Sequence, residues 1–214
     1  MALSKRTGTY GEYWGNDYNS SNVLTLEQMQ VNAFYIYSAL LDKGWHENAI
    51  CALLGNMQSE SSINPGRWQS DRVGGDASGH GYSLVQWTPY TKYTNWCSSQ
   101  GYSDPSEMDT AIARIIYEVE NKIQWIATSV YDMTFEDFTK SWNASYILAK
   151  AFMLCYERPA DQSVEKQNQR GEQANYWYKY LTGKEPYDPN YSKSKKKKGY
   201  KFVLFDRKRR IPYG

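Results

Sequence analysis

The sequence has 214 residues, of which 41% are hydrophobic, and its formal net charge is +2. This length suits one well-buried domain with tails better than two separate cores. No stretch approaches the length of a membrane-spanning helix, and the first 13 residues lack the apolar run of a secretory signal, so we expect neither feature.

Charge is distributed unevenly along the chain. Residues 187–214 hold 10 Lys or Arg against 2 acids, whereas residues 1–186 hold 15 basic and 21 acidic residues. We therefore predict an N-terminal extension at 1–23, a folded domain at 24–186 and a basic C-terminal extension at 187–214.

Helical patterns dominate the predicted domain. Thr25 and Gln28 form a capping-box pattern, and apolar residues then recur on one helical face as far as Gly44. A second helix is expected from about His46 to Ser61. Further helices are expected over 104–123, 134–140, 145–157 and 163–182.

The stretch 63–95 breaks the helical pattern. It is rich in Gly, Ser, Asn, Asp and Pro, which predicts turns and a small β-hairpin. A long loop-rich segment inside a helical domain is usually functional or disordered, and the aromatic residues of this one favour function. The expected fold class is therefore α+β and mainly α-helical.

Glu60 is the main candidate for catalysis. The apolar face of the second helix consists of Ile50, Leu53, Leu54 and Met57. Glu60 follows Leu53 by seven residues, about 20° away around the axis, so it points along the buried face in the last turn. The helix dipole and burial both disfavour a charged carboxylate there, and a carboxyl that keeps its proton can protonate a glycosidic oxygen. The alternative is that Glu60 only ends the helix and turns to solvent.

Two sequence elements resemble a known family. Residues 60–65, Glu-Ser-Ser-Ile-Asn-Pro, resemble the Glu-Ser motif of lytic transglycosylases and lysozyme-like folds. Residues 81–87, Gly-Tyr-Ser-Leu-Val-Gln-Trp, resemble their Gly-Leu-Met-Gln element. The longer string from Leu53 to Tyr90 is similar to the phage tail lysozymes, including the tail-knob lysins of short-tailed phages. The resemblance covers about residues 24–183.

The resemblance implies a lysozyme-like fold whose hairpin region lines a substrate cleft. It also implies a cut between N-acetylmuramic acid and N-acetylglucosamine, with Glu60 as the catalytic acid. Gln86 falls at the family's glutamine position, where its amide could bind a sugar acetamido group, orient a water or merely stabilise the hairpin. The other predicted substrate-binding residues are Asn64, Trp68, Tyr82, Trp87 and Tyr90. For the tryptophans and Tyr90, stacking on sugar rings and burial under the hairpin are both open.

A second carboxylate would decide the mechanism. Hydrolases of this kind use two carboxyl groups, whereas transglycosylases can use one acid with a hydroxyl or acetamido group of the substrate. The candidates are Asp71 and Asp76, although aspartate is also a common turn residue beside glycine. Asp76 directly follows two glycines and looks the more turn-like, which favours Asp71.

Other kinds of wall-degrading enzyme fit the sequence poorly. With only His46 and His80, a zinc site would match no familiar spacing, so we expect no metal and no cofactor. A cysteine nucleophile would have to be Cys97. We interpret Cys51, Cys97 and Cys155 as reduced and structural.

The resemblance places the protein in the virion, at the tail tip or knob, acting on peptidoglycan glycan strands of the host wall. The basic extension carries an apolar stretch, Phe202–Phe205, which favours docking onto another tail protein by strand addition. An anionic wall polymer or DNA is the alternative partner. The alternative function is a non-catalytic tail-tip plug or glycan-binding module that keeps the fold.

Overall fold

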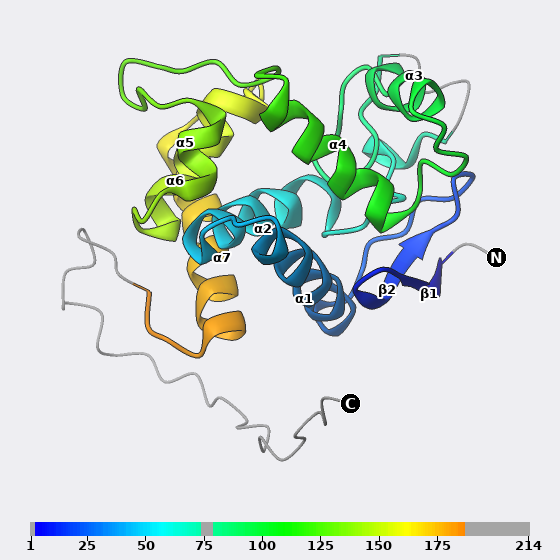
Figure 1. Ribbon diagram of the computed structural model, residues 1–214, viewed down its shortest axis with the longest axis horizontal. Helices are drawn as coiled ribbons and strands as arrows, with labels where there is room; N and C mark the ends of the chain where they lie inside the picture. Colours follow the sequence, from blue (N-terminus) through cyan, green and yellow to red (C-terminus); the bar gives the residue numbers. More distant parts are fainter. Residues whose placement is uncertain (1–2, 74–78, 187–214) are drawn as a thin grey trace.

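The computed structural model describes residues 3–73 and 79–186, which form a mainly α-helical α+β fold (Figure 1). The elements are β1 (Leu3–Gly8), β2 (Gly11–Asn16), α1 (Leu26–Asp42), α2 (Glu47–Ser61), η1 (Gln69–Asp71), α3 (Thr91–Ser99), α4 (Met108–Glu120), α5 (Phe135–Lys140), α6 (Ser145–Phe152), η3 (Met153–Glu157) and α7 (Val164–Thr182). Among the described helices, none is both long and apolar enough to cross a membrane. The predictions for residues 187–214 lie outside the described residues.

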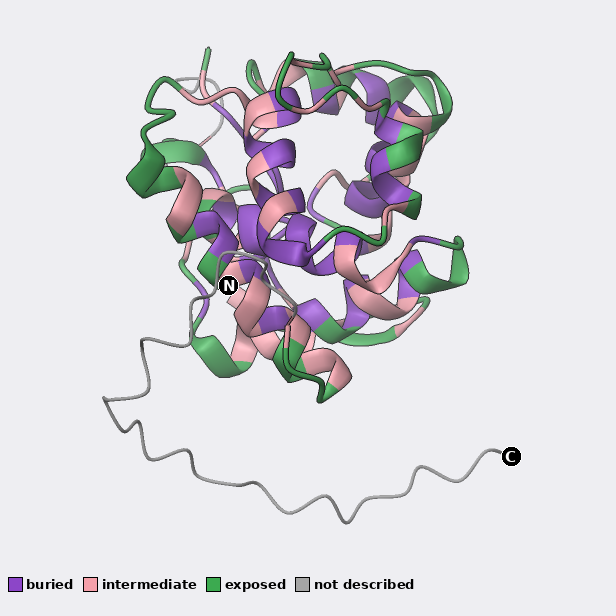
Figure 2. Ribbon diagram, turned by 90° about the vertical axis from the view of Figure 1, so that its left-hand side faces the viewer, coloured by how far each residue is buried: buried purple, intermediate pink, exposed green. Residues whose placement is uncertain are grey.

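Helix α2 is the centre of the fold. Every residue from Ala49 to Met57 is buried, and the helix packs against α7, α6 and α1. Figure 2 shows buried backbone gathered in the middle of the molecule. Gly55 permits the close approach of α7, since a Cβ there would lie 2.7 Å from the backbone nitrogen of Ala174 and from the carbonyl oxygen of Arg170. This contact fixes the register between α2 and α7.

The small sheet lies at the N-terminus rather than in the loop-rich stretch. Strands β1 and β2 pair antiparallel, from Leu3 opposite Asn16 to Gly8 opposite Gly11, and β2 packs on α1. The predicted N-terminal extension, residues 1–23, thus contains this hairpin, which buries Tyr13 in the core.

The described part of the stretch 63–95 has no strand pair, so the predicted hairpin is wrong in its location. Two isolated antiparallel bridges replace it, one between Trp68 and Tyr82 and one between Tyr82 and Trp87. Left-handed backbone at Ser83 and Gln86 turns the chain too sharply for a longer ladder. Helix α3 was not predicted, because its nine residues are too few to show a clear apolar period.

The other expected helices are present, with small shifts at their ends. Thr25 and Gln28 form the predicted capping box of α1, and the side chain of His46 caps α2 by accepting from the backbone nitrogen of Asn48. Helix α4 ends at Glu120, before the predicted end at 123.

Hydrogen bonds of asparagine side chains join β2 to the segment that follows α2. The Asn32 amide exchanges hydrogen bonds with the backbone of Trp14 and also donates to the carbonyl of Ile63, at 2.7–2.8 Å. Asn64 accepts from the backbone nitrogens of Asn16 and Gly66. Buried backbone groups of the segment that follows α2 are satisfied in this way, which holds the segment in place.

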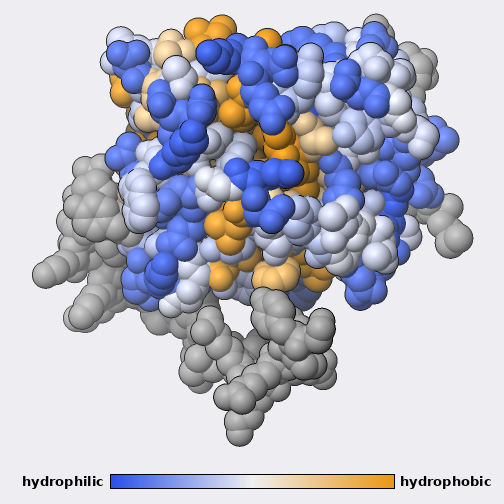
Figure 3. Space-filling model, in the orientation of Figure 1, coloured by the Kyte–Doolittle hydropathy of each residue, from blue (hydrophilic) through white to orange (hydrophobic). Residues whose placement is uncertain are grey.

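The surface is mainly polar. Figure 3 shows hydrophilic side chains over most of one face, around a band of apolar side chains. All three cysteines are buried and not disulfide-bonded, as predicted: Cys51, Cys97 and Cys155.

Candidate active site

A pocket of about 400 Å³ lies at the C-terminal end of α2. Its wall comes from segments that are distant in sequence: Glu60, 67–70, Gln86 with Thr88, and 157–160. Three sequence-predicted residues, Glu60, Trp68 and Gln86, are thus brought to one cavity.

Glu60 is paired with an arginine at this pocket. Its Oε1 lies 2.5 Å from Nη2 of Arg170 on α7, and the exposed fractions of the two side chains are 19% and 9%. Arg170 also donates to the carbonyl oxygen of Asn56, at 3.0 Å. Sequence reasoning missed Arg170, because nothing in the periodicity of α7 indicates that the α2–α7 contact brings it to a carboxyl 110 residues earlier.

The end of α2 is shaped by left-handed backbone. Ser62 and Ile63 have φ values of 56° and 55°, and the Ser61 hydroxyl donates to the carbonyl of Leu84 at 2.8 Å. The bend ends the helix at Ser61, one residue after Glu60, and the hydrogen bond joins the helix end to the segment that carries Gln86. Left-handed residues other than glycine are uncommon and concentrate at functional sites.

Gln86 lines the pocket, and its amide group is oriented by the protein. Its Nε2 donates to the carbonyls of Arg67 at 3.1 Å and Ser83 at 2.8 Å, so both amide protons are used within the protein. Its Oε1 is buried and has no hydrogen-bond partner among the described residues. In this arrangement Gln86 has no amide proton left to donate, and its acceptor oxygen is buried, so a hydrogen bond to a ligand requires the side chain to move.

The predicted aromatic residues contribute mostly to packing. Trp68 forms part of the pocket wall, but it is 0% exposed and donates through Nε1 to the carbonyl of Tyr18. Tyr82 and Trp87 are 0% and 3% exposed, so neither ring has a face open to a sugar. Tyr90 is only partly buried and packs edge-on against Trp68, outside the pocket wall.

Asn64 has a local structural role. It is fully buried, and both its amide oxygen and its amide nitrogen are engaged, the latter by the carbonyl of Asn22 at 2.9 Å. It does not line the pocket. Contact between Asn64 and a substrate therefore has no support in this geometry.

A buried carboxylate forms hydrogen bonds with residues next to two parts of the pocket wall. Glu118 on α4 accepts from Trp87 Nε1 at 3.0 Å, from Arg114 Nε at 2.9 Å and from the hydroxyl of Tyr156. Burial raises the pKa of Glu118, whereas these donors act in the opposite direction. The network fixes the residues that precede Glu157 and follow Gln86.

Glu157 is a second acid of the pocket, and sequence reasoning missed it. It ends η3 and lines the same cavity as Glu60, and its Oε1 is buried without a hydrogen-bond partner among the described residues. Burial raises its pKa well above the ordinary value, and the charge of Glu60 acts in the same direction, whereas Arg170 opposes it. The sequence places Glu157 only at the end of an expected helix, before Arg158 and Pro159.

The two aspartates proposed as second carboxylates are not tested by the structure. Asp71 ends η1, and its side chain is outside the described part of the chain. Asp76 also lies outside the described residues. Their catalytic role stays a prediction.

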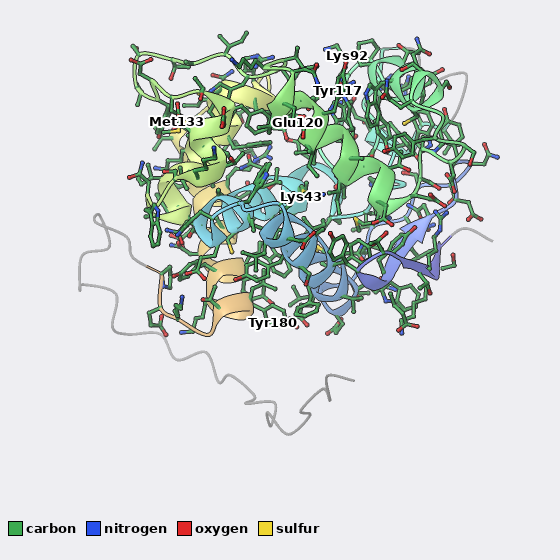
Figure 4. The ribbon with its side chains drawn as sticks, viewed as in Figure 1. Lys43, Lys92, Tyr117, Glu120, Met133 and Tyr180 are labelled. Atoms are coloured by element: carbon green, nitrogen blue, oxygen red, sulfur yellow. The ribbon has the colours of Figure 1, made fainter. Side chains whose placement is uncertain are left out.

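A second pocket of about 400 Å³ lies at α5, and two of its three acids, Glu136 and Asp137, already have partners. At the start of α5, the Asp137 carboxylate accepts from the backbone nitrogen and the hydroxyl of Thr134, and Glu136 pairs with Lys140. Met133, which lines this pocket, is labelled in Figure 4. It lies on the opposite side of α4 from the labelled Lys92. The described residues contain no group of three or more His, Cys, Asp or Glu side chains that could hold a metal ion. The pocket at Glu60 is therefore the better candidate for chemistry.

Comparisons with known proteins agree on one relationship. Residues 31–181 match the family described as phage tail lysozyme. Morphogenesis protein 1 of Bacillus phage B103 is 48% identical over 167 residues, which are 78% of this chain and 44% of that protein. The matched region thus spans less than half the length of that relative.

Proposed function

The chain belongs to the phage tail lysozyme family, and we propose that it cuts the glycan strands of bacterial peptidoglycan between N-acetylmuramic acid and N-acetylglucosamine. Its mainly helical α+β fold is lysozyme-like. The cut would open the host wall to the phage tail, with the protein carried in the virion.

The observation that carries this proposal is the position of Glu60. The carboxyl lies in the last turn of a buried helix, at a pocket large enough for part of a glycan, with Arg170 beside it and Gln86 in the same pocket wall. General acid catalysis needs a carboxyl within reach of the scissile oxygen in a partly desolvated site.

A structural role in the tail is the second candidate. The curated relative is named a morphogenesis protein, which describes assembly rather than catalysis. A lysozyme fold can also be kept without turnover. In either case, we propose that residues 187–214 attach the domain to other tail proteins, with an anionic wall polymer or DNA as alternative partners.

Cleavage of purified peptidoglycan by the Glu60→Gln variant separates the two candidates. The amide is nearly isosteric and can still accept from Arg170 but has no proton to transfer, so cleavage should fall by about 10²–10⁴-fold. The amide keeps the hydrogen bond to Arg170 but removes its counter-charge, so cleavage is compared at temperatures at which both proteins remain folded. Undiminished cleavage would contradict the role of Glu60, and a wild-type protein that cleaves nothing would favour the structural candidate.

Glu47→Gln is the matched control. Glu47 lies on the same helix, is 23% exposed and accepts from a cation, Lys184, at 2.8 Å, yet it is at the opposite end of α2. This variant should cleave like the wild type. Analysis of the products then distinguishes the mechanisms, because a transglycosylase leaves 1,6-anhydro ends and a hydrolase leaves reducing ends.

A further inference from the structure

Trp142 has the most exposed large apolar side chain of the described residues, with 82% of its surface open to solvent. It lies in the short loop that joins α5 to α6. A tryptophan ring carries a large apolar area, which folded domains and interfaces normally bury. Because this domain leaves almost the whole ring in water, the ring contributes little to the core and its surface is open to a ligand.

The protein orients this ring without burying it. The imidazole of His46 packs against it, with ring centroids 4.1 Å apart and planes inclined by 46°. The loop itself is held by the amide of Asn48, whose Nδ2 donates to the carbonyls of Trp142 at 3.1 Å and of Asn143 at 2.9 Å. Both supporting residues belong to the start of α2, the central helix of the fold. Ordering the ring on a ligand therefore costs little conformational entropy.

Polar groups flank the ring along the loop. Its neighbours in the chain are Ser141 and Asn143, and Asn143 is exposed. Within the described part of the chain the Asn143 side chain makes no hydrogen bond, so its amide can both donate to and accept from a ligand. The loop thus presents a flat apolar face and hydrogen-bonding groups close together.

This environment differs from that of an apolar surface cluster elsewhere in the protein. Val130, which is 74% exposed, shares one loop with two further exposed apolar residues, Ile123 and Ile126. Such a cluster is typical of a protein interface, whose core is apolar. A single aromatic ring with polar neighbours instead favours a small unit that has both apolar and polar groups.

A pyranose ring has this combination of groups. Its C–H groups form an apolar face that can lie on an aromatic ring, and the hydroxyl and acetamido groups at its edge can form hydrogen bonds with an amide. We propose that Trp142 is a stacking platform for a sugar ring of the peptidoglycan glycan, outside the pocket that contains Glu60. This inference rests on the proposed function, which supplies the class of ligand.

The platform and the pocket lie at opposite ends of α2. Glu60 follows His46 by 14 residues, which is about 21 Å along the helix axis at about 1.5 Å per residue. Since the buried helix separates them, a disaccharide in the pocket does not also contact the ring. The wall, however, offers many sugar rings to one protein molecule. Contact at Trp142 would therefore keep the domain on the glycan and raise its local concentration at the pocket, without a part in the cleavage itself.

Binding to insoluble peptidoglycan that has been stripped of anionic polymers tests this platform. The full-length Glu60→Gln protein serves as the parent, so that the glycan is not consumed while the bound fraction is measured. Addition of Trp142→Ala should weaken binding by about two- to tenfold, as expected for the loss of one aromatic stacking contact. Trp142→Phe keeps a flat ring and should retain most of the affinity. Trp142→Leu keeps an apolar side chain without a flat face and should bind as weakly as Trp142→Ala.

Val130→Ala is the matched control, because it removes exposed apolar surface at a different loop. It should bind like the parent. Thermal unfolding verifies that each variant is folded at the temperature of the measurement. With Glu60 intact, Trp142→Ala should raise KM for the insoluble wall by the same factor and leave kcat unchanged, and it should cleave short soluble glycan fragments like the wild type.

The platform is ruled out if the parent does not bind the stripped peptidoglycan, or if Trp142→Ala binds it as tightly as the parent does. Equal losses in Val130→Ala, or full binding by Trp142→Leu, would also exclude stacking on a flat ring. If light scattering shows that Trp142→Ala turns an oligomer into a monomer while glycan binding is unchanged, the ring contacts a second copy of the chain instead. The proposed function fails on a different result, normal cleavage by Glu60→Gln or none by the wild type, whichever variants bind.

Discussion

Loss of Arg170 should destabilise the fold, because it leaves a partly buried carboxylate without its cation. In Arg170→Met, Glu60 loses its ion-pair partner and the carbonyl of Asn56 loses a donor. Removing one member of a buried pair costs about 3–5 kcal/mol. Since the Glu60 side chain is 19% exposed, we expect the lower end, about 3 kcal/mol. For a protein of this size that corresponds to a fall of about 6–12 °C in thermal midpoint.

Thermal and urea unfolding measure this cost, and Lys140→Met is the control. Lys140 pairs with Glu136 at 2.6 Å, but the two side chains are 65% and 57% exposed. Exposed pairs contribute about 0–1 kcal/mol, so the control should change the free energy of unfolding by no more than that.

The double variant Arg170→Met with Glu60→Gln tests the assigned cause. It removes the unpaired charge, so it should be more stable than Arg170→Met alone, and the coupling should appear in a double-mutant cycle. The reasoning fails if Arg170→Met is no more destabilising than Lys140→Met. It also fails if the second substitution restores no stability.

Two further predictions concern the α2–α7 contact and the identity of the second carboxyl. Gly55→Ala places a Cβ 2.7 Å from two backbone atoms of α7, so the free energy of unfolding should fall by about 1–3 kcal/mol. Cleavage should also be reduced, because Arg170 is displaced. An unchanged free energy of unfolding together with unchanged cleavage would contradict the close contact. Asp71→Asn tests the predicted second carboxylate: a large loss of peptidoglycan cleavage would support Asp71 in that role, whereas a rate close to the wild type would favour Glu157, which lines the pocket with Glu60.

The interaction network explains why the pocket needs an entire folded domain. Glu60 comes from α2, its counter-charge from α7 and its neighbouring acid from η3, while Glu118 on α4 anchors the segments beside them. Residues far away in sequence decide whether the charged and polar atoms of each group have a partner. A small change in how these helices pack would therefore alter the charges around Glu60 while the overall fold stayed the same.

Local patterns in the sequence were sufficient for most of the helices and for Glu60. Capping at Thr25 and the apolar period of α2 depend only on neighbouring residues, so both could be predicted within one segment. The two motifs likewise placed Glu60 and Gln86 on one wall. The N-terminal hairpin was not predicted, because its two short strands become stable only by packing on α1.

Tertiary structure alone decided the partners of Glu60. Arg170 follows it by 110 residues and Glu157 by nearly as many, and neither carries a local signal that separates it from an ordinary helical residue. They meet at the pocket because Gly55 lets α7 lie against α2 and because the π-helical turn and left-handed Arg158 redirect the end of α6. The sequence determined which carboxyl ends a buried helix, whereas long-range packing determined which charges surround it, since electrostatic interactions depend on distance in space and on burial.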